Sequence, residues 1–121
     1  MKKWMLVALL VALPAAAQAM DVATFLTKAD GLKKKGMMAL FSSDLKPLKA
    51  EIQNQSEALR QERIAAKAAG RPQAYCPPGD RGSLNSDELL AAFHTIPAAQ
   101  QPRVEVKDAL RALLARKYPC R

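Results

Sequence analysis

Two cysteines, Cys76 and Cys120, constrain the fold of this chain more than any other feature. They lie 44 positions apart. In an oxidising compartment an even cysteine count is typical of a disulfide, and closing a loop of this length restricts the unfolded chain by about 4 kcal/mol. A metal pair and a catalytic thiol are the alternatives. Because the single histidine, His94, completes only a poor ligand set, the sequence predicts a structural Cys76–Cys120 disulfide in an exported protein.

The N-terminal segment predicts that export. Lys2 and Lys3 precede an uncharged apolar run over residues 4–13, and Ala17-Gln18-Ala19 offers small residues at the two positions that a signal peptidase recognises. The apolar run has about half the length of a membrane span. An uncleaved anchor is the alternative, but the cleavage site is well placed and the segment lacks a lipobox cysteine. We therefore expect a signal peptide over residues 1–19 and a periplasmic protein that starts at Met20.

The predicted mature chain, residues 20–121, is a single basic domain. The signal peptide removes two lysines and no acidic residue, so the formal net charge of +8 falls by two, to +6. Export and the lack of aromatic residues beside the basic ones argue against nucleic acid as a partner. The charge therefore indicates solubility, attraction to anionic envelope polymers or complementarity to an acidic protein. No later stretch is long and apolar enough to predict a membrane span.

Helical periodicity dominates the first half of this domain, and no window alternates with the period of a strand. We expect Asp21 to cap a first helix that carries Lys33–Lys35 in its last turn and ends at Gly36. A short apolar turn is expected to follow it and to fill the core. The residues of the first apolar face are Val22, Phe25, Leu26, Ala29 and Leu32, and those of the short turn are Met37, Met38, Leu40 and Phe41.

A long helix is expected next, capped by Ser42 or Ser43, with Pro47 in its first turn, where a missing N–H costs least. Gly70 and Pro72 are expected to close it. Its narrow apolar stripe consists of Leu45, Leu48, Ile52 and Leu59. A long helix with so thin a stripe either packs along one groove or meets a second subunit.

The second half predicts two shorter helices after a loop over residues 71–84, where proline and glycine are dense. Asn85 and Glu88 have the spacing of a capping box, and Pro97 should end the helix that they start. The last helix is expected at about residues 104–117. The inward faces are Leu89, Leu90 and Phe93, then Val106, Leu110, Leu113 and Leu114. The chain therefore predicts an all-α fold, a small bundle of about four helices with one disulfide.

No pattern in the sequence indicates catalysis. A nucleophile elbow, a P-loop, an HExxH motif and a glycine-rich dinucleotide turn are all absent. His94 falls at a helix end, and Asp87 and Glu88 fall in a first helical turn, where each stabilises the helix dipole without any proton transfer. We therefore expect no enzyme activity, no cofactor and no metal.

The second half resembles a known family. A cysteine followed by Pro-x-Gly precedes a helix, a proline follows that helix, and the chain closes on an aromatic-Pro-Cys sequence. The residues that carry the pattern are Tyr75-Cys76-Pro77-Pro78-Gly79, Leu84, Leu89-Leu90, Phe93, Ile96-Pro97, Val106, Ala109-Leu110 and Tyr118-Pro119-Cys120. Together with the signal peptide, this order is similar to that of the Tai-type amidase-immunity proteins of type VI secretion systems. The resemblance covers residues 75–120, whereas residues 20–74 share only their helical character.

The resemblance implies a periplasmic all-α protein, often a homodimer, that binds a peptidoglycan amidase effector and blocks its active-site cleft. Such an inhibitor needs a rigid scaffold with enough buried contact rather than chemistry of its own. An envelope housekeeping or chaperone-like helical protein without a cognate toxin is the alternative.

Two proline-bearing connections remain as docking candidates once the apolar faces and the lysine run are assigned to the core and to a helix end. Stiff loops lose little entropy on binding. The polar residues predicted to contact a partner are Asp80, Arg81, Gln100, Gln101 and Arg103. The alternative is that both loops serve only as connectors.

Overall fold

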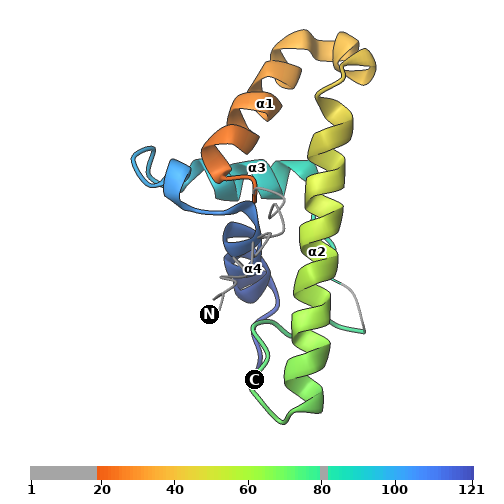
Figure 1. The fold of residues 1–121 in the computed structure, drawn as a ribbon, viewed down its shortest axis with the longest axis vertical. Helices are drawn as coiled ribbons and strands as arrows, with labels where there is room; N and C mark the ends of the chain where they lie inside the picture. Colours follow the sequence, from red (N-terminus) through yellow and green to blue (C-terminus); the bar gives the residue numbers. More distant parts are fainter. Residues whose placement is uncertain (1–18, 80–81) are drawn as a thin grey trace, which may run out of the picture.

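The computed structural model describes residues 19–79 and 82–121 (Figure 1). These residues form four α-helices, two short 3₁₀-helices and no strand. The elements are α1 (Val22–Lys35), η1 (Gly36–Phe41), α2 (Leu45–Ala68), α3 (Ser86–His94), η2 (Gln101–Arg103) and α4 (Val106–Lys117). The all-α prediction is confirmed. The predicted signal peptide lies outside the described residues, apart from Ala19.

Helix α2 runs along one side of the molecule, and the other helices pack against it or against one another (Figure 1). Helix α1 forms a hairpin with α2 through η1, α3 lies across the middle, and α4 packs beside the second half of α2. An ion pair of 3.8 Å between Lys28 and Asp44 joins α1 to the start of α2. The thin apolar stripe of α2 is therefore shared between α1 and α4.

Local signals place both ends of α1 as predicted. The Asp21 carboxylate accepts a hydrogen bond of 2.7 Å from the backbone N–H of Thr24, and Gly36 ends the helix with a φ of 56°, a conformation that suits glycine. Val22 also donates its backbone N–H to the carbonyl of Val104, at 2.8 Å. This contact belongs to an isolated antiparallel bridge that places the first residues of α1 beside the first residues of α4.

The core contains the helical faces that the sequence predicts. Rings of Phe25 and Phe93 meet edge to face with centroids 5.4 Å apart, a favoured aromatic geometry that ties α1 to α3. The buried side chains are Val22, Phe25, Leu26, Leu32, Leu48, Leu59, Tyr75, Leu89, Phe93, Val106, Ala109, Leu110 and Leu114. The predicted face residues Ala29, Leu45, Ile52, Leu90 and Leu113 pack against this core partly buried.

The turn after α1 is helical, but the prediction that it fills the core is wrong. Met37, Met38 and Phe41 keep 81%, 67% and 84% of their surface exposed, and the side chain of Leu40 lies outside the described part of the structure. A turn at the outer bend of a hairpin is covered on neither side, because the chain reverses before another element can pack over it. The three exposed residues are called the apolar tip below.

The start of α2 also differs from the prediction. Neither Ser42 nor Ser43 caps the helix, which begins after Asp44 without a side-chain cap. The Ser42 hydroxyl instead accepts a hydrogen bond of 3.3 Å from the backbone N–H of Asp44, the two-residue turn that serine forms in competition with capping. Pro47 does fall in the first turn, as predicted.

The capping box of α3 is confirmed. Asn85 Oδ1 accepts from the Glu88 N–H at 2.8 Å, and Glu88 Oε2 accepts from the Asn85 N–H at 3.1 Å. Helix α4 begins at Val106, two residues later than predicted, because residues Gln101–Arg103 form η2 and Val104 is extended. No helix in residues 19–79 and 82–121 is both long and apolar enough to cross a membrane.

Candidate functional site

The predicted disulfide closes the C-terminal end of the molecule. Cys76 and Cys120 are bonded, with Cα atoms 4.9 Å apart. The Cys76 N–H also donates to the carbonyl of Tyr118 at 2.8 Å. The proline-rich loop after α2 is thereby fastened to the last residues of the chain.

Two side chains from the end of α4 fasten the same loop further along. The Tyr118 hydroxyl accepts from the Ser83 N–H at 3.1 Å and donates to the Ser83 carbonyl at 3.2 Å. Lys117 Nζ donates to that carbonyl at 2.7 Å and to Glu88 Oε2 at 2.9 Å. We call the set of Cys76, Cys120, Ser83, Glu88, Lys117 and Tyr118 the C-terminal brace.

The brace depends on the absence of a side chain at Gly82. A Cβ atom there would lie 2.8 Å from Cε2 of the Tyr118 ring, closer than real Cβ contacts. Glycine therefore lets the loop pass directly against the tyrosine. This is a requirement for close approach rather than for an unusual backbone angle.

In the brace, the contact between Glu88 and Lys117 shifts the pKa of both groups. Hydrogen bonding from Lys117, followed by the Asn85 N–H, lowers the pKa of the Glu88 carboxyl. Reciprocally, the hydrogen bond to Glu88 raises the pKa of Lys117. The pair therefore stays ionised around neutral pH. Because both groups face solvent, its contribution to stability is small.

A second charge cluster joins α2 to α4. Glu62 on α2 accepts from Lys107 and, at 3.0 Å, from Arg111, which also pairs with Asp108 at 2.7 Å. The hydrogen bond from Lys107, with that from Arg111, lowers the pKa of Glu62 despite some desolvation. These contacts hold the second half of α2 against α4.

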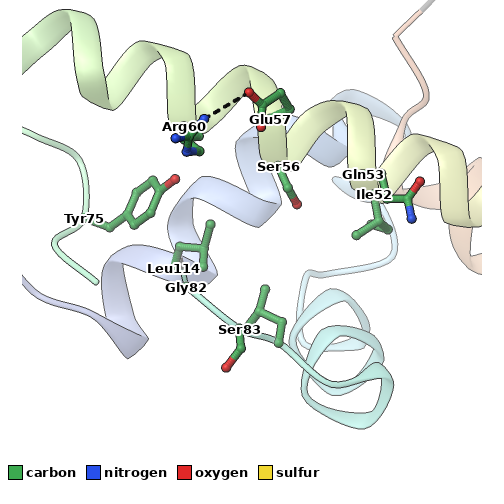
Figure 2. A pocket seen from close by; sticks show the side chains of 10 residues that line it. Ile52, Gln53, Ser56, Glu57, Arg60, Tyr75, Gly82, Ser83 and Leu114 are labelled. Atoms are coloured by element: carbon green, nitrogen blue, oxygen red, sulfur yellow. Dashed lines mark hydrogen bonds and ion pairs between the residues drawn. The ribbon is translucent and has the colours of Figure 1, made fainter. Parts of the chain in front are cut away.

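A pocket with a volume of about 560 Å³ lies between α2 and the braced loop. In Figure 2, Tyr75 and Leu114 point toward α2, where Glu57 and Arg60 pair at 3.3 Å. The pocket is lined by Ile52, Gln53, Ser56, Glu57, Arg60, Tyr75, Gly82, Ser83, Leu84 and Leu114. It combines a carboxylate, a guanidinium and hydroxyl groups with aliphatic walls.

This pocket is not predictable from the sequence, because its walls come from three separate segments of the chain. The one local signal was Gly82, which permits the close contact with Tyr118. Among the described residues, those that line the pocket include no histidine or cysteine. They offer hydrogen-bonding groups and apolar contact.

The predicted partner-binding residues are only partly described. Asp80 and Arg81 lie outside the described residues. Gln100, which precedes η2, and Arg103, the last residue of η2, are both exposed. Gln101 is half-buried and donates its side-chain amide to the Ile96 carbonyl at 2.9 Å, so it shapes the loop. The docking role of these five residues stays a prediction.

The two connections that bear these residues lie at opposite ends of α4. Ser83 contacts Tyr118, just after the last turn of α4, whereas Arg103 precedes its first turn. A helix of 12 residues is about 18 Å long. A single partner that contacted both connections would have to extend along the whole of α4.

One further pair of titratable residues joins two helices. His94 Nε2 lies 3.3 Å from Asp30 Oδ1 and joins α3 to α1. Within the described ranges, no group of three or more His, Cys, Asp or Glu side chains is arranged to hold a metal ion.

Comparison with known proteins adds no relative: no family model, no curated protein and no solved structure matches the chain. The resemblance of residues 75–120 to amidase-immunity proteins therefore stays a prediction that rests on the motif residues alone.

Proposed function

We propose that this protein is a periplasmic immunity-type binding protein that neutralises a peptidoglycan amidase effector by occluding its active site. The C-terminal brace is the observation that carries the proposal. It lies within the family-like residues 75–120 and holds a proline-rich loop by the Cys76–Cys120 bond and by Tyr118 and Lys117.

The brace suits an inhibitor for a physical reason. A loop that is held on both sides, here at Cys76 and at Ser83, loses less entropy when a partner binds, so more of the contact energy appears as affinity. The adjoining pocket adds polar side chains, among them Arg60, a residue type that is enriched at interfaces. None of these features calls for catalysis by the protein itself.

Inhibition of an amidase tests the proposal directly. The candidate effector is a small cysteine-type amidase encoded beside this gene, assayed by its hydrolysis of purified peptidoglycan. We expect the oxidised protein to inhibit the amidase stoichiometrically. We also expect the immobilised protein to retain the amidase when it is incubated with periplasmic extract. If the gene has no such neighbour and the extract yields no amidase, the housekeeping alternative replaces the proposal.

Charge reversal in the two connections locates the interface. Arg81→Glu combined with Arg103→Glu should leave the melting temperature nearly unchanged and weaken inhibition at least tenfold. The matched control, Lys34→Glu with Lys49→Glu, reverses two exposed lysines near the apolar tip and should inhibit like wild type. Full inhibition by the arginine variant would move the interface to the polar side of α2 between Glu51 and Arg63.

A further inference from the structure

The apolar tip exposes a concentration of hydrophobic surface that the fold does not use. Met37, Met38 and Phe41 belong to one six-residue turn and each keeps at least 67% of its surface exposed. Single exposed apolar residues are ordinary, but several large ones gathered in one place mark a surface that binds something. In Figure 1, η1 lies at the end of the molecule opposite the described C-terminus.

Lysines surround the apolar tip. Lys33, Lys34 and Lys35 occupy the last turn of α1, while Lys46 and Lys49 lie in the first turn and a half of α2, and all five are exposed. From the rise per residue, the first three lie within roughly 3 Å of the end of α1 and the other two within roughly 6 Å of the start of α2. We call these five residues the lysine collar.

Little negative charge offsets the collar. Residues 28–50 contain six lysines and two aspartates, a net charge of +4. Both aspartates already have partners: Asp30 contacts His94 at 3.3 Å and Asp44 contacts Lys28 at 3.8 Å. No collar lysine forms an ion pair with another described residue, although Lys35 donates to the Ser42 hydroxyl at 3.2 Å. The collar is therefore free to meet an external anion.

We propose that the apolar tip inserts into the surface of a bilayer rich in anionic phospholipid, with the lysine collar at the level of the phosphates. Apolar side chains stabilise such binding by entering the boundary between headgroups and acyl chains, while lysines beside them are attracted to the anionic headgroups. Long lysine side chains can also lie along apolar surface and keep their ammonium groups at the phosphates.

The shape of the tip favours a bilayer over an acidic protein. The three side chains project from the outer bend of a hairpin and are exposed together, so full burial requires contact from several sides. Acyl chains can surround such a projection, whereas an acidic protein would need a hollow of matching shape as well as charge. The inference goes beyond the proposed function, because a protein can occlude an amidase without any contact with lipid. It shares with that proposal only the expected location in the envelope.

Co-sedimentation with vesicles tests the inference, using the oxidised protein produced from the full-length gene and no amidase. We expect it to bind phosphatidylglycerol vesicles and to remain in solution with phosphatidylcholine vesicles. Binding should weaken when salt is raised from about 0.1 M to about 1 M, since screening then shortens the reach of the lysine charges.

Matched variants separate the two parts of the surface. Met37→Ser with Phe41→Ser should lower the partition coefficient at least tenfold, and glutamine at Lys33, Lys34 and Lys35 should lower it roughly five-fold per lysine. Ile64→Ser, at an apolar residue of α2 that is 39% exposed, is the apolar control. The charge control replaces the exposed Lys67, Arg71 and Arg116 with glutamine. Both controls should bind within about two-fold of wild type.

Several results would overturn the inference: no binding to phosphatidylglycerol, equal binding to both lipids, or tip variants that bind like wild type. Loss of amidase inhibition in the tip variants without any vesicle binding would assign the tip to a protein partner instead. Because the vesicle assay contains no amidase, its failure would leave the proposed inhibitory function untouched.

Discussion

The two ends of this molecule are held in opposite ways. At the C-terminal brace, residues far apart in the sequence are joined by a disulfide and by the contacts of Ser83 with Tyr118 and Lys117. At the apolar tip the contacts are local, such as the Ser42 N–H bonded to the Ala39 carbonyl at 3.0 Å. The long-range contacts are therefore concentrated around the loop after α2, whereas the hairpin bend is held by local contacts and stays exposed.

The largest expected effect tests whether the two ends share one folding unit. Phe93 is fully buried in α3 and pairs with Phe25 of α1, so Phe93→Ala should cost about 3–5 kcal/mol. Denaturant unfolding followed by circular dichroism measures it. A single transition at lower denaturant would show one cooperative unit, whereas two transitions would show that the tip hairpin unfolds separately from the braced half. An unfolding free energy equal to wild type would contradict the assigned core.

Removing the disulfide should lower the stability of the whole domain and also loosen the braced end locally. Cys76→Ala with Cys120→Ala should cost about 2–4 kcal/mol, because the unfolded chain regains the freedom of a 44-residue loop. For a domain of this size that is a fall in melting temperature of roughly 10–30 °C.

Hydrogen exchange localises this effect. Amides of the loop from Cys76 to Leu84 should exchange faster, while those of η1 should keep their wild-type rates. Equal acceleration at both ends would show that the contrast between them is false.

Acid should next loosen both the brace and the charge cluster that joins α2 to α4. The folded-state pKa values of Glu88 and Glu62 are lowered by Lys117 and Lys107, so these carboxylates stabilise the fold above their unfolded pKa. That contribution is lost as pH falls through the lower folded-state values, below about 4.5. Unfolding free energy measured against pH should therefore decline in this acidic range. Glu88→Gln combined with Glu62→Gln should make the decline shallower, and an unchanged slope would contradict the assignment.

The smallest effect is expected at the tip. Met37→Ser with Phe41→Ser should change the unfolding free energy by less than about 0.5 kcal/mol, because both side chains already face solvent. Leu48→Ser, at a buried position of α2, is the contrasting control and should cost several kcal/mol. A large loss from the tip variant would mean that the tip is packed in solution, for instance against a second copy of the chain.

Most of the fold followed from local signals. Asp21 and Asn85 start helices because their carboxylate and amide groups satisfy free N–H groups in the first turn. Gly36 ends a helix because it adopts positive φ without strain. Such signals act over three or four residues, so they survive in any tertiary context. Ser42 was misassigned because its hydroxyl can bond to the N–H two residues ahead as readily as it can cap a helix.

The candidate site was much less predictable. The pocket beside the brace combines α2, the loop at Gly82–Leu84 and Leu114 of α4, and no spacing in the sequence links these segments. The exposure of the apolar tip was not predictable for a related reason. Methionine and phenylalanine are residue types typical of a core, and only the hairpin geometry shows that no described segment covers Met37, Met38 and Phe41.

The sequence by itself determined the helical class, the inward faces, the proline and glycine boundaries and the cysteine pair, because periodicity, capping and ring constraints act through near neighbours. Only the tertiary structure decided that the residues of the apolar tip stay exposed and where the surface is hollow. Burial depends on whether a distant segment arrives over a side chain. Phe93 met Phe25 of α1 and is fully buried. No described segment arrived over Phe41, which stays exposed.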